Sequence, residues 1–287
     1  MILNIPCRSN PMPYYKYVSP EPDYSTLPLT FKSYGSVIFQ LGKAGSPNTN
    51  TFYINKKTAS TGQETGWQLY TIGTNISLSD GDTVAFSGTN GSLNMSGDNN
   101  RWHFISDDSM SNSKYLEVYG NIQSLTNYQT LTNYVYRGLF YDQFGILSSA
   151  WNLVLPSANL PQEAFACLFR GSSTKIAPKM MHISDPMPSY LFDATFHSNS
   201  GVKYIGIDCS EFSYTYTKNN WVSYVSSNGV FVRTYPRTPY TRGNGAIPNN
   251  WTVIDLCEDG KYYLDNGSGT PTNTEVIVNP DGTYTTV

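Results

Sequence analysis

The chain has 287 residues, of which 14% are charged and 39% hydrophobic, and its formal net charge is −3. Such a low content of Lys and Arg argues against an electrostatic grip on nucleic acid or on an anionic membrane. No apolar run is long enough to span a bilayer. The 23 Tyr, 23 Gly and 17 Pro favour strands and turns, so we expect a mainly β protein.

Residues 1–28 differ from the rest of the chain, with six prolines and four tyrosines. Proline disfavours helices and central strands, whereas tyrosine offers rigid, amphipathic contact area. The segment also lacks the basic and apolar regions of a secretory signal. We therefore predict an extended arm that docks on a partner. Its docking residues are Pro11, Pro13, Tyr14, Tyr15, Tyr17 and Tyr24.

Short β-branched and aromatic runs follow the arm, for example over residues 37–41, 51–54 and 83–86. Turn signals such as Asp80-Gly81-Asp82 separate them. Strands of four to six residues at this close spacing are typical of a small antiparallel sandwich. We assign the sandwich to residues 29–119.

Residues 120–218 contain a degenerate internal repeat, in which an aromatic residue stands four positions before a phenylalanine. The pairs are Tyr136 with Phe140, Phe165 with Phe169, and Phe192 with Phe196. Because positions i and i+4 share a face of a helix, we expect a short helix with one buried aromatic pair in each unit. A strand and a short helix recurring every 20–30 residues or so is typical of leucine-rich-repeat solenoids.

The chain after the repeats divides into two further parts. Residues 219–257 predict a β-rich C-terminal cap, and residues 258–287 predict a turn-rich tail with one strand-like run over residues 275–278. The predicted fold is therefore mainly β. It has an extended N-terminal arm, a small antiparallel β-sandwich, and a short leucine-rich-like repeat solenoid with short helices and a β cap.

Candidate chemical sites are weak in this sequence. The four cysteines are isolated, which favours reduced thiols over a zinc or redox site. Asp80 and Asp82 bracket a tight turn and offer too few oxygen ligands for calcium. His182 and His197 have no ligand partner at a suitable spacing, so we expect them on the surface of the repeats.

No catalytic fingerprint is present, so we expect no enzyme, no catalytic residue, no cofactor and no metal site. One alternative stays open, because a pair of carboxylates for glycoside hydrolysis can form in space without any sequence signature.

Aromatic side chains are the stronger functional candidates, because they can stack on sugar rings or bind a protein partner. Trp67 is one such residue. The predicted surface contacts are Trp102, Tyr134, Tyr136, Tyr141 and Trp151.

Four segments carry a resemblance to a known family. They are YTIGTNISLSDGDTVAFSG at 70–88, NLVLP at 152–156, WVSYVSSNGVF at 221–231 and IPNNWTV at 247–253. In this order they resemble leucine-rich-like (BspA-type) surface repeat proteins of gut Bacteroidetes and of the phages that infect them. The resemblance covers about residues 29–254 and implies a strand-rich module followed by repeats. The sequence departs from the family at the usual repeat cysteines, which are replaced by Val135, Ala164, Ser172 and Ser198.

The resemblance, together with the arm, implies a structural protein of a virion, such as a head fibre, decoration or tail-associated protein of a crAss-like phage. The arm would dock on capsid or tail proteins, and the adhesive body would face the host surface or its glycans from the particle surface. We expect a homo-oligomer, a trimer rather than a dimer, with no nucleic-acid partner and no membrane insertion. The alternative is a bacterial cell-surface adhesin or glycan-binding module that lacks its export signal.

Overall fold

The computed structural model describes residues 22–46, 49–90, 93, 100–107, 111, 113–142, 144–184, 187–210, 220–243 and 245–287. Over these residues the chain is mainly β, as predicted. Helix is limited to short turns such as η1 (Ile122–Thr126), and no helix of the described part is long and apolar enough to cross a membrane. Some predicted docking residues lie outside the described part. They are Pro11, Pro13, Tyr14, Tyr15 and Tyr17.

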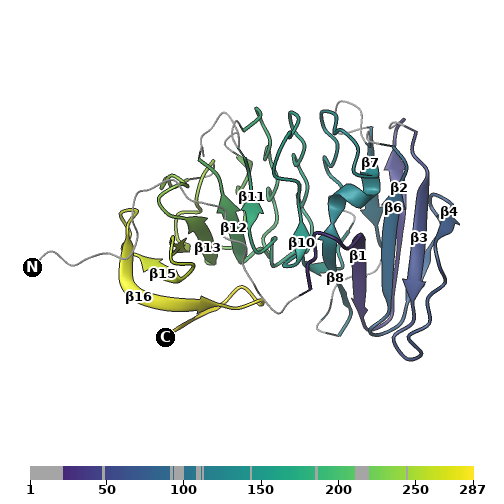
Figure 1. Ribbon diagram of the computed structural model, residues 1–287, viewed down its shortest axis with the longest axis horizontal. Coiled ribbons are helices and arrows are strands. Elements are labelled where there is room, and N and C mark those ends of the chain that lie inside the picture. Colours follow the sequence, from purple (N-terminus) through teal and green to yellow (C-terminus); the bar gives the residue numbers. More distant parts are fainter. Residues whose placement is uncertain are drawn as a thin grey trace, which may run out of the picture.

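The N-terminal part of the body is a sandwich of two sheets (Figure 1). The larger sheet has the strand order β10-β8-β1-β6-β3-β4, with β9 also paired to β8, and the smaller has the order β5-β2-β7. The first eight strands are β1 (Leu29–Tyr34), β2 (Val37–Ala44), β3 (Phe52–Lys57), β4 (Gln68–Tyr70), β5 (Ile76–Leu78), β6 (Thr83–Gly88), β7 (Arg101–Ile105) and β8 (Tyr115–Asn121). Phe31 of β1 contacts Phe104 of β7 at a ring-centroid distance of 4.6 Å, so aromatic packing joins the two sheets. The predicted β-rich sandwich is confirmed.

The sandwich continues into the repeats without a break. β8 pairs in parallel with β9 (Leu147–Ser149) and β10 (Leu153–Val154). Isolated bridges then link Ser149 to Ile176 and Ile176 to Tyr204. One hydrophobic core extends along the chain from Leu29 to Val253. The predicted boundary after residue 119 falls inside β8, so the two predicted units form one folded body.

A third sheet has the order β11-β12-β13-β14-β15-β16-β17. Its parallel strands are β11 (Met181–His182), β12 (Tyr204–Asp208), β13 (Val230–Thr234) and β14 (Thr252–Leu256). Its antiparallel strands are β15 (Tyr262–Asp265), β16 (Pro271–Val278) and β17 (Tyr284–Thr286). The parallel strands are buried almost throughout, because one face joins the main core and the other packs against a second core.

Residues 258–287 contain more strand than predicted, although the predicted strand-like run over residues 275–278 does lie in β16. These residues form β15 to β17, and Figure 1 shows β16 as a long curved strand below β12 and β13. Val276 of β16 packs in the second core with Tyr204 and Val230. Gly282, in the β16–β17 turn, has a φ of +79°, and a Cβ there would come within 2.7 Å of Ile176 Cδ1. Glycine therefore allows the hairpin to close over the repeats.

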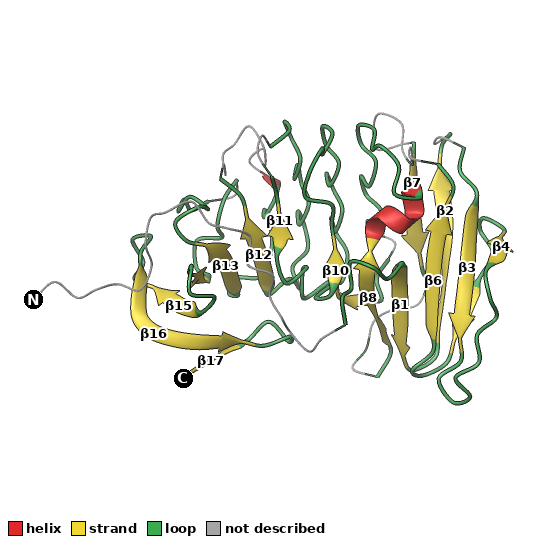
Figure 2. Ribbon diagram, viewed as in Figure 1, coloured by secondary structure: helices red, strands yellow, loops and turns green. Residues whose placement is uncertain are grey.

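The repeats contain turn ribbons where short helices are predicted, at residues 134–142, 163–171 and 190–198. Figure 2 draws these segments as loops. In each ribbon, alternate N–H groups donate to the carbonyl three residues back, as Leu139 does to Tyr136. The intervening N–H groups donate to the next coil, as Phe140 does to Leu168 at 3.0 Å. The prediction of helices is wrong because every fourth residue is left-handed, which prevents continuous i to i−4 bonding.

The predicted burial of the aromatic pairs is confirmed, since all six side chains are 0% exposed. The turn ribbon also repeats every four residues, so positions i and i+4 still share a face. The rings form two aromatic ladders across successive coils. One joins Tyr136, Phe165 and Phe192 at 6.1 and 5.9 Å between ring centroids. The other joins Phe140, Phe169 and Phe196 at 5.3 and 5.6 Å.

Candidate binding surface

Three of the predicted surface contacts are buried, so the prediction is wrong for them. Trp102 is 5% exposed and packs against Phe52 with 5.1 Å between ring centroids. Tyr136 is 0% exposed, because it is the first member of an aromatic ladder. Trp151 is 6% exposed and lies on Tyr204 at 4.9 Å in the second core. None of the three is open to a partner.

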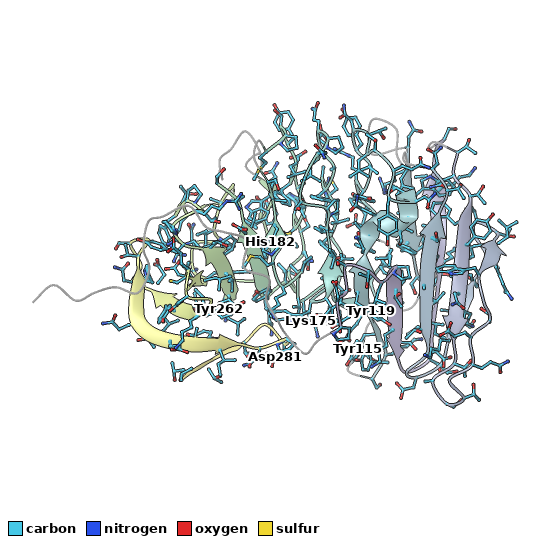
Figure 3. All side chains as sticks on the ribbon, in the orientation of Figure 1. Tyr115, Tyr119, Lys175, His182, Tyr262 and Asp281 are labelled. Atoms are coloured by element: carbon cyan, nitrogen blue, oxygen red, sulfur yellow. The ribbon has the colours of Figure 1, made fainter. Side chains whose placement is uncertain are left out.

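Tyr24 lies against the body, although the sequence places it in the arm. Its ring meets the edge of Tyr119, labelled in Figure 3, with 5.6 Å between centroids. Asn121 holds the same segment, because its N–H donates to the Leu27 carbonyl at 2.8 Å and its Nδ2 to the Ser25 carbonyl at 3.1 Å. The body therefore begins before Leu29, and Tyr24 belongs to it.

Tyr134 and Tyr141 are partly exposed, at the two ends of the first turn ribbon. The outer side of the three ribbons, together with Tyr224 at the following coil, is named the turn face here. It carries two rows of equivalent positions in successive coils. The first row contains Tyr134, Glu163 and Tyr190, and the second contains Tyr141, Arg170 and His197.

The turn face carries tyrosines in a backbone conformation that tyrosine disfavours. The ribbons need a left-handed residue at every fourth position, and Gly138 meets this need at φ 64°. Tyr134, Tyr190 and Tyr224 take the same conformation at φ 66°, 58° and 61°. A bulky residue held there costs roughly 1–3 kcal/mol. Such strain is common at functional sites, and Tyr224 is 78% exposed.

The second row surrounds its rings with polar groups. The guanidinium carbons of Arg101 and Arg170 lie 4.3 and 5.4 Å from the centroid of the Tyr141 ring. Burial raises the pKa of Tyr141, against the opposing effect of Arg170. Burial also lowers the pKa of His197, and Arg170 lowers it further. The edge of the His197 ring contacts Tyr224 at 5.5 Å between centroids, so an uncharged imidazole supports the exposed ring at neutral pH.

A matched pair of charges joins Glu163 of the first row to a neighbouring arginine. Arg137 Nη1 forms an ion pair with Glu163, and both side chains are 12% exposed. The guanidinium of Arg137 also lies 6.0 Å from the centroid of the Tyr134 ring. These charges neutralise one another within the surface, so the row presents mainly rings and hydrogen-bonding groups.

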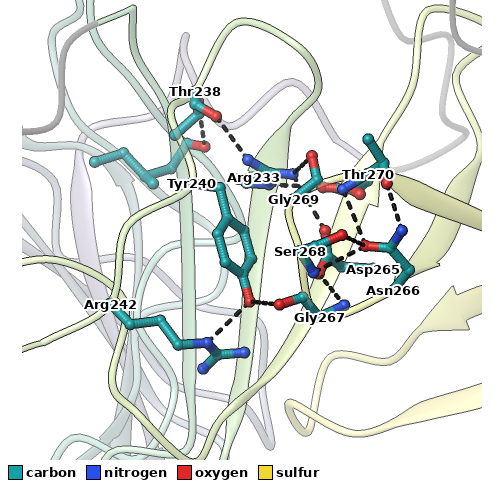
Figure 4. A network of polar contacts seen from close by, with 12 residues as sticks. Arg233, Thr238, Tyr240, Arg242, Asp265, Asn266, Gly267, Ser268, Gly269 and Thr270 are labelled. Carbon is teal, nitrogen blue, oxygen red and sulfur yellow. Dashed lines mark hydrogen bonds and ion pairs between the residues drawn. The ribbon is translucent and has the colours of Figure 1, made fainter.

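Figure 4 shows a polar network around Arg233. Arg233 is 2% exposed, and its Nε donates to Asp255 Oδ1 at 2.7 Å. Its Nη1 donates to the Thr238 carbonyl at 3.0 Å. Its Nη2 donates to the Gly269 carbonyl at 2.8 Å and to Asp265 Oδ2 at 3.3 Å. The network fixes the loop after β15 against β13 and β14, which is a structural role.

The network predicts a pH dependence of stability. Burial raises the pKa of Asp255 from its ordinary value of 3.8 to about 6, against the lowering effect of Arg233. Because the folded pKa exceeds the unfolded one, the stabilising contribution is complete below 3.8 and is lost as the pH rises through about 6. In urea unfolding, we expect the protein to gain stability relative to Asp255→Asn as the pH falls from about 7 to about 5. Parallel pH profiles for the two proteins would contradict this assignment.

The remaining polar candidates have structural partners. His182 Nδ1, whose residue is labelled in Figure 3, lies 3.0 Å from Asp208 Oδ2, and Arg237 Nη1 lies 2.5 Å from Asp208 Oδ1. Burial alone would raise the pKa of Asp208, but hydrogen bonds from His182 and Arg237 hold it below its ordinary value. His182 is largely exposed on the repeats, as predicted. Asp82 accepts the N–H groups of Ser79 and Ala59 at 3.0 and 2.9 Å.

Two further observations concern metal and thiol chemistry. Within the described residues, no group of three or more His, Cys, Asp or Glu is arranged to hold a metal ion. Cys167 and Cys209 are buried and form no disulfide, as expected. Cys257 is disulfide-bonded, so the prediction of a reduced thiol is wrong at this position.

Comparison with protein-family models, with curated proteins and with solved structures finds no significant match to this chain. The turn face is therefore assigned from its own geometry. The pattern of the sequence led to Tyr134 and Tyr141. It gave no indication of Tyr190 or Tyr224, because nothing in a sequence marks a tyrosine as left-handed.

Proposed function

We propose that this protein is a non-catalytic structural component of a phage virion, such as a head fibre, decoration or tail-associated protein. Its N-terminal arm docks on capsid or tail proteins, and its body displays an adhesive surface toward host glycans. In this proposal the body is a sandwich joined to a short leucine-rich-like solenoid. The observation that carries it is the turn face, where Tyr134, Tyr190 and Tyr224 are left-handed, Tyr224 is exposed and the other two are half-buried.

Passive adhesion agrees with the chemistry of the turn face. Aromatic rings and matched charges give many weak contacts, which become strong when several copies act together. Self-association supports the same function, because symmetric copies multiply both anchoring and binding. We propose a trimer in preference to a dimer.

The start of the described chain supports the proposed anchor. The first described segment, purple in Figure 1, runs beside β8. There Tyr24 and Tyr119 are in contact, and Asn121 donates two hydrogen bonds to the segment. These contacts attach the residues that follow the arm to β8 of the body.

The anchor can be tested in the full chain by changing Tyr14, Tyr15 and Tyr17 together to serine. We expect the amount of this variant in purified phage particles to fall to about a tenth of the parent amount or less. Loss of roughly 1.4 kcal/mol of binding free energy from the three rings is enough for a tenfold decrease. Quantitative mass spectrometry of the particles measures it. The matched control changes Tyr134, Tyr190 and Tyr224 to glycine and leaves incorporation unchanged. Incorporation of the arm variant at the normal level would reject the anchor.

A further inference from the structure

The tyrosines of the turn face are an unusual choice for their backbone positions. Gly138 and Gly171 show that glycine serves the left-handed positions of the ribbons, at φ 64° and 63°. Tyr224 occupies such a position at φ 61° and leaves 78% of its side chain in solvent. Backbone preference does not account for a ring at this position, and the ring contact with His197 leaves most of the Tyr224 side chain exposed. Recognition of a ligand does account for it.

The spacing of the rings follows from the coils. Tyr134 and Tyr190 stand at equivalent positions two coils apart, since each coil is hydrogen-bonded to the next through its backbone. At about 4.8 Å between neighbouring hydrogen-bonded segments, two coils correspond to roughly 10 Å. The ladder rings below them, 5.3 to 6.1 Å apart between centroids, fix this register. Rings repeated along one axis suit a ligand that is itself a linear repeat.

The chemistry of the surface restricts the ligand further. The electron-rich face of tyrosine attracts the polarised C–H groups on the flat side of a sugar ring. Side chains beside the rings offer hydrogen bonds to hydroxyl groups, among them Ser198, whose Oγ lies 2.8 Å from His197 Nδ1. The ion pair of Arg137 with Glu163 leaves no excess of positive charge for an acidic chain at that point.

We propose that the turn face binds an extended, uncharged polysaccharide that lies across successive coils, with Tyr134 and Tyr190 on one side and Tyr224 on the other. This inference rests on the proposed adhesive function and names the ligand class of that surface. Hydrogen bonds to the sugar hydroxyls come from polar side chains of the second row and from Ser198 beside it. Binding is independent of ionic strength, because no net charge is neutralised.

Affinity electrophoresis of the full chain tests the proposal, in native gels that contain one dissolved polysaccharide each. Xyloglucan, galactomannan, arabinoxylan and dextran are the uncharged probes, and polygalacturonate and heparin are the anionic ones. We expect at least one uncharged probe to retard the protein equally at low and high salt. Tyr224→Gly should bind about 2- to 10-fold more weakly, whereas Tyr224→Phe should keep most of the affinity.

Thermal unfolding separates recognition from structure. Glycine relieves the strain at φ 61°, so Tyr224→Gly should melt at the same temperature as the parent or higher. The control Leu69→Ala removes a side chain that is 66% exposed on β4, at the sandwich end of the body in Figure 1, and should not change binding.

Several outcomes would overturn the proposal. They are retardation by none of the uncharged probes, retardation by the anionic probes alone with loss at high salt, unchanged binding by Tyr224→Gly, and a lowered melting temperature in that variant. None of these outcomes bears on the separate measurement of how much of the Tyr14, Tyr15 and Tyr17 variant enters the particles. A failed ligand class is therefore distinguishable from a failed virion assignment.

Discussion

Arg233→Met is expected to lower the free energy of unfolding by roughly 3–5 kcal/mol, the usual cost of breaking a buried ion pair from one side. Arg233 is 2% exposed, and its ion-pair partners Asp255 and Asp265 have side chains 0% and 1% exposed. Removal of the guanidinium leaves two carboxyl groups in the interior without their positive partner. It also leaves the carbonyls of Thr238 and Gly269 without a donor.

Urea unfolding at neutral pH measures this loss. Arg237→Met is the matched control, because Arg237 pairs with Asp208 but its side chain is 31% exposed. We expect that variant to lose about 1 kcal/mol or less, since solvent screens a partly exposed pair. Combining Arg233→Met with Asp255→Asn should recover part of the loss, because one of the buried charges is removed. If the two arginine variants lost the same free energy of unfolding, burial of the Arg233 ion pairs would not increase their contribution to stability.

The class of the fold could be predicted from the sequence, but the face on which a residue lies could not. Trp102 illustrates the difficulty. Strand alternation predicts that neighbours in β7 point to opposite sides, yet Trp102, His103 and Phe104 are all buried. Burial of this strand depends on distant parts of the chain: β2 pairs with one edge of β7, and at the other edge the N–H of Phe104 donates to the carbonyl of Leu139 in the first turn ribbon. Because Phe104 and Leu139 are 35 positions apart, their contact produces no local pattern in the sequence of β7.

The burial of the aromatic repeat was predicted correctly, but its secondary structure was predicted wrongly. Both outcomes have the same physical cause. A helix and a turn ribbon both bring positions i and i+4 to one side, so the spacing of Phe165 and Phe169 fits either. The distinguishing feature is a left-handed residue within each unit, at Cys167 and Ala194. Neither residue type marks that conformation, so the sequence favoured the commoner element.

Only residues 275–278 of the C-terminal hairpin were predicted as a strand, because the rest of its two strands is polar. β16 contains the sequence PTNTEVIV and is mostly half-exposed or exposed, whereas the expected signal is an alternating apolar run. Only Val276 is deeply buried among its last four residues. The hairpin is held by β-sheet pairing with β15 and by the second core, which are both contacts with distant parts of the chain.

Phe169→Ala is expected to destabilise the protein by about 3–5 kcal/mol, the range for large-to-small changes at a buried phenylalanine. Phe169 is 0% exposed and is the middle ring of its ladder, 5.3 Å from Phe140 and 5.6 Å from Phe196 between centroids. Its removal takes away both stacking partners at once and opens a cavity between two coils. The backbone bonds between the coils restrict how far the neighbours can move into that cavity.

Phe169→Leu separates volume from stacking. Leucine fills most of the space, so the loss should fall to about 1–3 kcal/mol, as measured by urea unfolding. Ile277→Ala, at a side chain 57% exposed on β16, is the surface control and should change stability by less than about 0.5 kcal/mol. A loss in Phe169→Ala no greater than that of this control would show that the ladders do not hold the coils together. Because the ladders also set the spacing of Tyr134 and Tyr190, the folded Phe169→Leu variant should bind any polysaccharide of the turn face more weakly than the parent.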